Sequence, residues 1–145
     1  MTKTRMTSIA AALSGVALAG CGAGMGVRQT ADLGPAPAAG TGLASGQCFR
    51  TQDIRNHTIV GDRTLLLNVR GKDYYRVTMV GSCLAGAIPS DPIITRQPPG
   101  SPIVCKPIDL DIGIGRDGFE TRCIVESIVP MTPAEVAALP PRLKP

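Results

Sequence analysis

The sequence predicts a mainly β domain, a small antiparallel β-barrel or curled sheet of about five to six strands with a short C-terminal helix and two disulfides. Three observations favour this fold class. Apolar and polar residues alternate over residues 65–79 and again over residues 108–129, which is the period of a half-buried strand. Four cysteines follow an export signal. Aromatic residues are scarce, so a core of Ile, Leu and Val would benefit from covalent staples.

The first residues have the features of a bacterial lipoprotein signal. Lys3 and Arg5 precede an apolar segment that ends in Leu18-Ala19-Gly20-Cys21. Small residues before a cysteine predict cleavage that leaves Cys21 as a lipidated N-terminus, so residues 1–20 are assigned to the signal peptide. The alternative is an ordinary secretory signal in which the cysteine is incidental. The apolar segment is shorter than the roughly 20 residues that a transmembrane helix needs.

Residues 21–46 are predicted to be a lipidated, flexible tether because Gly, Ala, Pro, Thr and Ser dominate them. Such a chain has a reach of roughly 25 to 30 Å. Acyl chains on Cys21 would insert into the lipid bilayer, and each buried methylene contributes roughly 0.8 kcal/mol. We therefore expect an exported protein, lipid-anchored on the periplasmic side of a bacterial membrane. Gly22 directly after Cys21 favours the outer membrane.

Charge does not point to nucleic acid. The formal net charge of the chain is +4, and it falls to +2 when Lys3 and Arg5 leave with the signal peptide. The remaining cations are scattered among acids, with no basic run of the kind that binds phosphates. We expect no nucleic-acid partner.

The strongest strand signal is a hairpin. Leu65, Leu67 and Val69 alternate with Leu66, Asn68 and Arg70, residues 70–73 supply a turn, and residues 75–79 alternate in the same way. This pattern predicts two antiparallel strands with one buried face.

A proline-rich excursion over residues 84–104 separates this hairpin from the next. Within it only residues 93–95 have strand composition, and the prolines place them at a sheet edge. Residues 108–114 and 119–129 then predict a second hairpin, with Asp117-Gly118 at its turn. Residues 113–118 match the G-x-G-x-x-G pattern, but a strand rather than a helix follows, so we interpret them as a hairpin and not as a dinucleotide site.

A short helix is predicted to close the domain. Thr132 would be its N-cap, Pro133 its first residue and Glu135 the partner in a capping box. Met131 would pack on Val136, and Val136 and Leu139 would face the sheet. The disulfide-stapled β domain is therefore assigned to residues 47–139, and residues 140–145 to a Pro-rich tail.

Cys48, Cys83, Cys105 and Cys123 remain once Cys21 is lipidated, and an even number in an exported chain predicts two disulfides. Four cysteines allow three pairings. We favour Cys83 with Cys105, which would close the proline-rich excursion, and Cys48 with Cys123, which would join the first strand to the last. Sequential pairing of Cys48 with Cys83 is the alternative. Zinc is disfavoured because no two of the four have C-x-x-C spacing.

No residue set predicts catalysis, a metal or a cofactor. Asp109, Asp111 and Asp117 could approach calcium, but the pattern lacks the late bidentate Glu of an EF-hand, so we interpret them as solvated outer-face carboxylates. His57 is the only histidine, and we interpret it as a loop residue because no nucleophile and orienting acid accompany it.

One binding patch is a candidate. Lys72, Tyr74 and Arg76 alternate at the predicted hairpin tip, where they could form an exposed aromatic and basic surface. Packing against the sheet is the alternative role for a strand tyrosine.

The spacing of several motifs resembles a family of small bacterial exported proteins, many of them lipoproteins, that is described only as a domain of unknown function. The motifs are Cys48-Phe49, Asp62-Arg63-Thr64, Tyr75-Arg76-Val77, Gly81-Ser82-Cys83, Val104-Cys105, Cys123-Ile124-Val125 and Thr132-Pro133-Ala134-Glu135-Val136. The resemblance covers residues 47–139 and implies export and domain limits, not an activity. Members often carry a tryptophan near the position of His57, which this chain lacks.

These observations favour a membrane-tethered, non-enzymatic module that binds a protein or polymer of the cell envelope. The alternative is an inhibitor-like barrel that inserts the loop over residues 84–104 into an envelope lytic enzyme, because rigid loops bind at little ordering cost. A hydrolase acting through Asp109, Asp111 and His57 is a more distant candidate.

Overall fold

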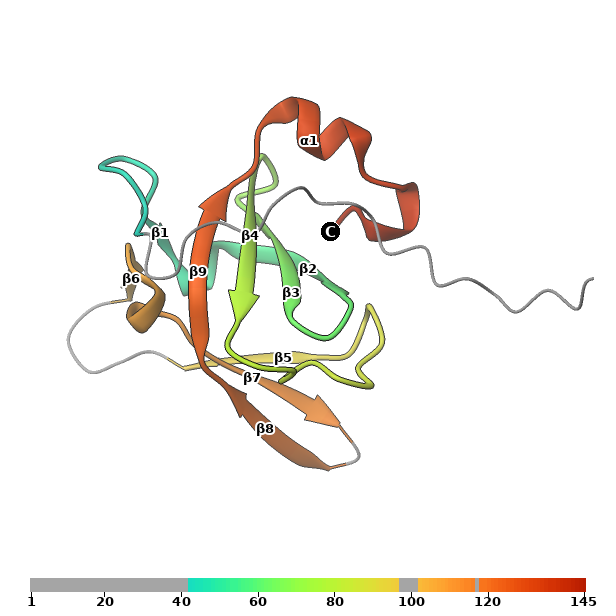
Figure 1. The fold of residues 1–145 in the computed structure, drawn as a ribbon. Coiled ribbons are helices and arrows are strands. Elements are labelled where there is room, and N and C mark those ends of the chain that lie inside the picture. Colours follow the sequence, from blue (N-terminus) through green and yellow to red (C-terminus); the bar gives the residue numbers. More distant parts are fainter. Residues whose placement is uncertain (1–41, 97–101, 117) are drawn as a thin grey trace, which may run out of the picture.

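The hairpin of β3 (Thr64–Val69) and β4 (Asp73–Met79) lies at the centre of the fold (Figure 1). The computed structural model describes residues 42–96, 102–116 and 118–145. The signal peptide, Cys21 and most of the predicted tether lie outside these residues. In chain order the elements are β1 (Phe49–Arg50), the 3-10 helix η1 (Thr51–Asp53), β2 (Ile54–Val60), β3 (Thr64–Val69), β4 (Asp73–Met79), β5 (Ile93–Arg96), β6 (Ile103–Val104), η2 (Pro107–Asp109), β7 (Asp111–Arg116), β8 (Phe119–Cys123), β9 (Val125–Pro130), α1 (Pro133–Ala138) and η3 (Pro141–Leu143).

Four antiparallel strands form the largest sheet, in the order β2-β3-β4-β9. The first predicted hairpin is confirmed, with Leu67 of β3 opposite Tyr75 of β4. Its turn holds Arg70 at φ 56° and Gly71 at φ 78°, the left-handed conformations that a tight hairpin requires. Arg70 is not a glycine, and its ion pair with Asp53, 3.0 Å away, helps to hold this unusual conformation.

Both faces of this hairpin are buried, so the prediction of one buried face is wrong. Val77 lies in the main core, and its neighbour Arg76 is only 8% exposed on the opposite face. The C-terminal segment covers that face. Arg76 forms an ion pair of 2.9 Å with Glu135 of α1, and the side-chain amide of Asn68 donates to the carbonyl of Pro145 at 3.3 Å.

A second sheet has three antiparallel strands in the order β5-β7-β8. The second predicted hairpin is confirmed, with Arg116 opposite Phe119 across a two-residue turn in which Gly118 has φ 81°. The edge position of β5 is also confirmed. The strand predicted over residues 119–129 is two strands, because the chain changes sheet at Ile124, after which β9 pairs with β4. Ile108 lies in η2 and is 83% exposed, not part of a strand.

The two predicted disulfides are present, but the favoured pairing is wrong. Cys48 bonds to Cys105 and Cys83 bonds to Cys123. Cys48 directly precedes β1 and Cys105 directly follows β6, and the antiparallel pairing of these two short strands brings the cysteines together. The second bridge forms because the backbone N–H of Val80 donates to the carbonyl of Ile124 at 2.8 Å, which places the segment after β4 beside the end of β8.

All three sheets contribute to one hydrophobic core, which is why a small domain can be built from short strands. Its buried members include Phe49 of β1, Leu65 of β3, Ile112 of β7 and Ile128 of β9. The described strands number nine rather than about five to six. They form sheets of two, four and three strands instead of one closed ladder, so the barrel is not confirmed.

The predicted helix is confirmed with its start signals. Thr132 accepts from the backbone N–H of Glu135 at 3.2 Å, and the Glu135 carboxylate accepts from the backbone N–H of Thr132 at 2.7 Å. Residues 140–145 are not a free tail, because η3 follows α1 and Leu143 is buried. At the other end, the side chain of Leu43 packs on the core, and its backbone N–H donates a hydrogen bond to the carbonyl of Cys105. The folded part therefore extends beyond both predicted limits.

Candidate functional site

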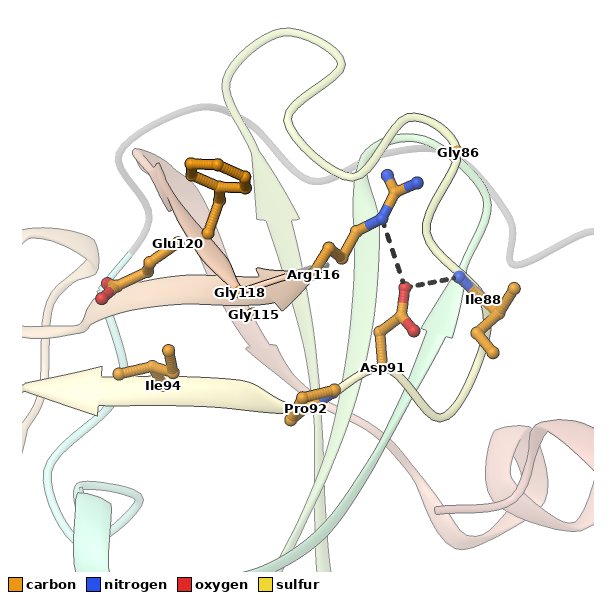
Figure 2. A pocket seen from close by; sticks show the side chains of 10 residues that line it. Gly86, Ile88, Asp91, Pro92, Ile94, Gly115, Arg116, Gly118 and Glu120 are labelled. Atoms are coloured by element: carbon orange, nitrogen blue, oxygen red, sulfur yellow. Dashed lines mark hydrogen bonds and ion pairs between the residues drawn. The ribbon is translucent and has the colours of Figure 1, made fainter.

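A cleft of about 780 Å³ lies where the loop after β4 meets the β7–β8 hairpin. Figure 2 shows its side chains, which come from the segment 86–94 on one side and from the hairpin on the other. The lining residues are Gly86, Ile88, Asp91, Pro92, Ile94, Gly115, Arg116, Gly118, Phe119 and Glu120.

Two large apolar side chains of the cleft are exposed. Phe119 is 80% exposed and Ile88 is 58% exposed. Phe119 is held there because it begins β8 directly after the turn, on a strand whose first four residues all face solvent. Covering a Phe or Ile side chain fully contributes roughly 1.5 to 3 kcal/mol, so a partner that fills the cleft would gain binding energy from both.

An ion pair fixes the shape of one end of the cleft. The Asp91 carboxylate accepts from the backbone N–H of Ile88 at 3.0 Å and lies 3.7 Å from Nε of Arg116, as Figure 2 shows. Arg116 also donates to the carbonyl of Ala85 at 3.2 Å. Asp91 is tied a third time, since its carbonyl lies 2.7 Å from Nε2 of His57 in β2.

A second ion pair closes the other end. Glu120 of β8 pairs with Arg96 of β5 across the face of β7, and this hydrogen bond raises the pKa of Arg96. The Glu120 side chain lies over Gly113, where a Cβ atom would come within 2.6 Å of its carboxylate. A glycine in the middle strand therefore makes room for the bridge. The G-x-G-x-x-G match thus forms a hairpin, as interpreted from the sequence.

The predicted patch of Lys72, Tyr74 and Arg76 is only partly brought together. Lys72 is exposed and Tyr74 is half-buried, and both line a smaller pocket of about 270 Å³. Arg76 is buried beneath α1, where it pairs with Glu135. The prediction is wrong for Arg76. Tyr74 and Arg76 lie on the same face of β4, but the C-terminal segment covers this face at Arg76.

Beside this pocket, Tyr75 has a structural role. Burial raises the pKa of its phenol, with a further contribution from the charge of Asp73, so the hydroxyl stays protonated. It donates to the carbonyl of Gln47 at 2.8 Å, and its ring contacts Phe49 at 4.7 Å between centroids. These contacts fasten the N-terminal entry of the domain to β4.

The distant hydrolase candidate is not assembled. His57 lies in β2 rather than in a loop and contacts Asp91. Asp109 lies in η2 rather than on a strand, and its carboxylate accepts from the backbone N–H groups of Cys105 and Lys106. Among the described residues, no group of three His, Cys, Asp or Glu is placed to hold a metal ion.

Asp111 is also engaged elsewhere. It begins β7, and its carboxylate lies 3.8 Å from Arg96 and 3.9 Å from Arg122. The interpretation as an outer-face carboxylate therefore holds for Asp111 but not for Asp109, while Asp117 lies outside the described residues.

Sequence reasoning missed Asp91 and Ile88 because both lie in the proline-rich segment, which has no strand or helix period. It missed Arg116 because no local signal shows that the end of β7 lies beside that segment. One usable signal for the cleft was Phe119. It stands between the turn residue Gly118 and the charged residue Glu120, a position where an aromatic side chain is rarely buried. In the described parts of the chain, no helix combines the length and apolar character needed to cross a membrane. No family model, curated protein or solved structure compared with the chain matches it, so the resemblance stays a prediction.

Proposed function

We propose that this chain is a lipid-anchored, non-enzymatic binding module of the bacterial cell envelope, which binds its partner in the cleft beside Phe119. The anchoring half rests on Leu18-Ala19-Gly20-Cys21 and the small-residue tether that follows. The two disulfides fit an oxidising compartment such as the periplasm. Gly22 after Cys21 favours the outer membrane.

The observation that carries the binding half is the pair of exposed apolar side chains, Phe119 and Ile88, at a cleft of about 780 Å³. Large apolar side chains gathered at a concave surface are typical of an interaction site. The charges at the two ends of the cleft are already paired within the chain. A protein segment or an envelope polymer that binds through apolar contacts and hydrogen bonds is therefore the partner class we propose.

A matched pair of variants tests this assignment. Phe119→Ser removes the exposed aromatic side chain of the cleft, and Ile108→Ser removes an apolar side chain that is 83% exposed but does not line the cleft. Loss of roughly 1.5 to 3 kcal/mol corresponds to roughly 10- to 100-fold weaker binding. Co-sedimentation with purified peptidoglycan and crosslinking to envelope proteins would measure binding of a polymer and of a protein.

We expect Phe119→Ser to weaken binding and Ile108→Ser to leave it unchanged. Equal binding of both variants would remove the cleft from the proposal. Absence of binding to either probe by the unsubstituted protein would remove the binding function itself.

An inhibitor of an envelope lytic enzyme is the second candidate, and the exposure of Ile88 favours it because this residue lies on the loop that would enter an active site. The loop is shorter than the segment 84–104, since Leu84 and Val104 are fully buried and β5 occupies the middle. Replacing residues 85–90 by a Gly-Ser linker should abolish inhibition of a lytic enzyme on cell-wall substrate. Undiminished inhibition would exclude this loop.

A further inference from the structure

β8 is an edge strand of the three-stranded sheet, and no described strand pairs with its outer side. Phe119, Glu120, Thr121 and Arg122 are all exposed. An exposed edge presents unpaired backbone N–H and C=O groups that can pair with a further strand. Glu120 and Arg122 lie two residues apart, so their opposite charges share one face of the strand.

The pairing of β8 with β7 decides which backbone groups face outward. Arg116 and Phe119 close a two-residue turn, so they form a hydrogen-bonded pair, and hydrogen-bonded pairs then recur at every second residue. Phe119, Thr121 and Cys123 therefore bond to β7. The backbone groups of Glu120 and Arg122 point to the outer edge, and only these two residues can bond to an added strand. Sγ of Cys83 lies 3.4 Å from the carbonyl of Arg122, but this sulfur is part of a disulfide and carries no hydrogen to donate.

We propose that two copies of this chain associate through β8, antiparallel, about a two-fold axis at Thr121. In a two-fold pair, an outward-facing residue of one copy lies opposite an outward-facing residue of the other, which allows three registers. Glu120 opposite Glu120 and Arg122 opposite Arg122 each face like charges, which are destabilising across a strand pair. With Thr121 opposite Thr121, Glu120 of each copy lies opposite Arg122 of the other, and the symmetry forms this favourable pair twice.

The side chains at this edge fit that register. Arg122 is 67% exposed and its nearest carboxylate within the chain, on Asp111, is 3.9 Å away, so its guanidinium can donate to a second carboxylate. Glu120 already pairs with Arg96 through Oε1, so Arg122 of the other copy would be a second cation at this carboxylate. Phe119 is 80% exposed at one end of β8 and Ile124 is 71% exposed just past the other. Antiparallel pairing brings Phe119 of each copy toward the Ile124 end of the other, so apolar surface is covered at both ends. Because Phe119 also lines the cleft, the dimer and a partner bound in the cleft would compete for it.

Charge reversal tests the register. The full chain carrying Cys21→Ala is compared by sedimentation equilibrium with Glu120→Arg, with Arg122→Glu, and with both substitutions together. Each single variant would face like charges twice, so we expect at least a tenfold weaker self-association. The double variant exchanges the charges across the interface and should associate more strongly than either single variant. Its loss of the Glu120–Arg96 ion pair is shared with Glu120→Arg, which is therefore its matched control.

The decisive sample is an equimolar mixture of the two single variants, because one supplies two cations and the other two carboxylates at the pairing positions. We expect heterodimers where neither variant alone forms dimers. A starting protein that stays monomeric up to its solubility limit, or single variants that self-associate as strongly as it does, would overturn the proposal. Circular dichroism of every variant would establish that it folds.

A crosslinking experiment on the lipidated full chain in cells gives an independent readout. In this register the two Thr121 residues form a non-hydrogen-bonded pair about 4.5 Å apart between Cα atoms, within the range that a disulfide spans. Thr121→Cys should therefore give a covalent homodimer. Asn56→Cys, exposed on the edge strand β2, is the matched control and should not. Equal dimer yields, or crosslinks of Thr121→Cys only to other proteins, would contradict self-pairing.

Discussion

Removal of the Cys83–Cys123 bridge should cost a large share of the stability of the domain. These cysteines are 40 residues apart in sequence, for which the chain-entropy model gives about 4 kcal/mol. Small domains are stable by only about 5 to 15 kcal/mol. The bridge also ties the segment after β4 to the strand that changes sheet at Ile124, so its loss would loosen the wall of the cleft.

Urea unfolding followed by circular dichroism measures the effect. Cys83→Ala/Cys123→Ala is compared with the unsubstituted protein and with Cys48→Ala/Cys105→Ala, whose 57-residue separation gives about the same 4 kcal/mol. Both variants should unfold at markedly lower urea concentrations. A loss below about 1 kcal/mol for either pair would contradict this prediction, as would two or more titratable thiols in denatured, unreduced Cys21→Ala protein.

Two further predictions concern single side chains. Glu135→Gln should cost about 1 kcal/mol at pH 7, because the amide can still cap α1 but the charge beside nearly buried Arg76 is lost. Hydrogen bonds from the backbone and side chain of Thr132, and then the charge of Arg76, lower the pKa of Glu135. This difference in unfolding free energy should therefore be full above the unfolded pKa of about 4.3 and be lost progressively as pH falls through the lower folded pKa; an unchanged difference at pH 3 would contradict this. Gly113→Ala should cost about 1 to 3 kcal/mol by crowding Glu120, and adding Glu120→Ala should recover part of the loss in urea midpoint.

Hairpins were predictable from sequence because their signals are local. The alternation around Leu67 and the turn residues Arg70-Gly71 act within a few residues of one another, and so do the cap residues Thr132 and Glu135. Burial of the polar side of the hairpin depends instead on a segment about 60 residues further along. Arg76 is buried next to Glu135, whose carboxylate pairs with it at 2.9 Å. The residue pattern of β4 gives no sign of this distant partner.

The predicted pairing of the cysteines is wrong for a similar reason. It depends on the point at which one continuous strand signal divides between two sheets, and Ile124 looks like any other strand residue in the sequence. The strand β2 could not be predicted because it includes exposed Arg55 and Asn56 and half-buried His57, which have none of the apolar character expected of a strand. The cleft could not be predicted for the same two reasons. His57 of β2 holds Asp91, and the strand change at Ile124 determines how the β7–β8 hairpin meets the rest of the domain.

We propose above all that lipid on Cys21 holds this domain at a membrane. Growth with labelled palmitate, followed by mass spectrometry of the N-terminal peptide of the mature protein, tests it directly. We expect a mature chain that begins at acylated Cys21 and fractionates with the membrane, and we expect Cys21→Ala to lose both label and membrane association. An unlabelled, soluble periplasmic protein, or a mature chain that begins at another residue, would contradict it.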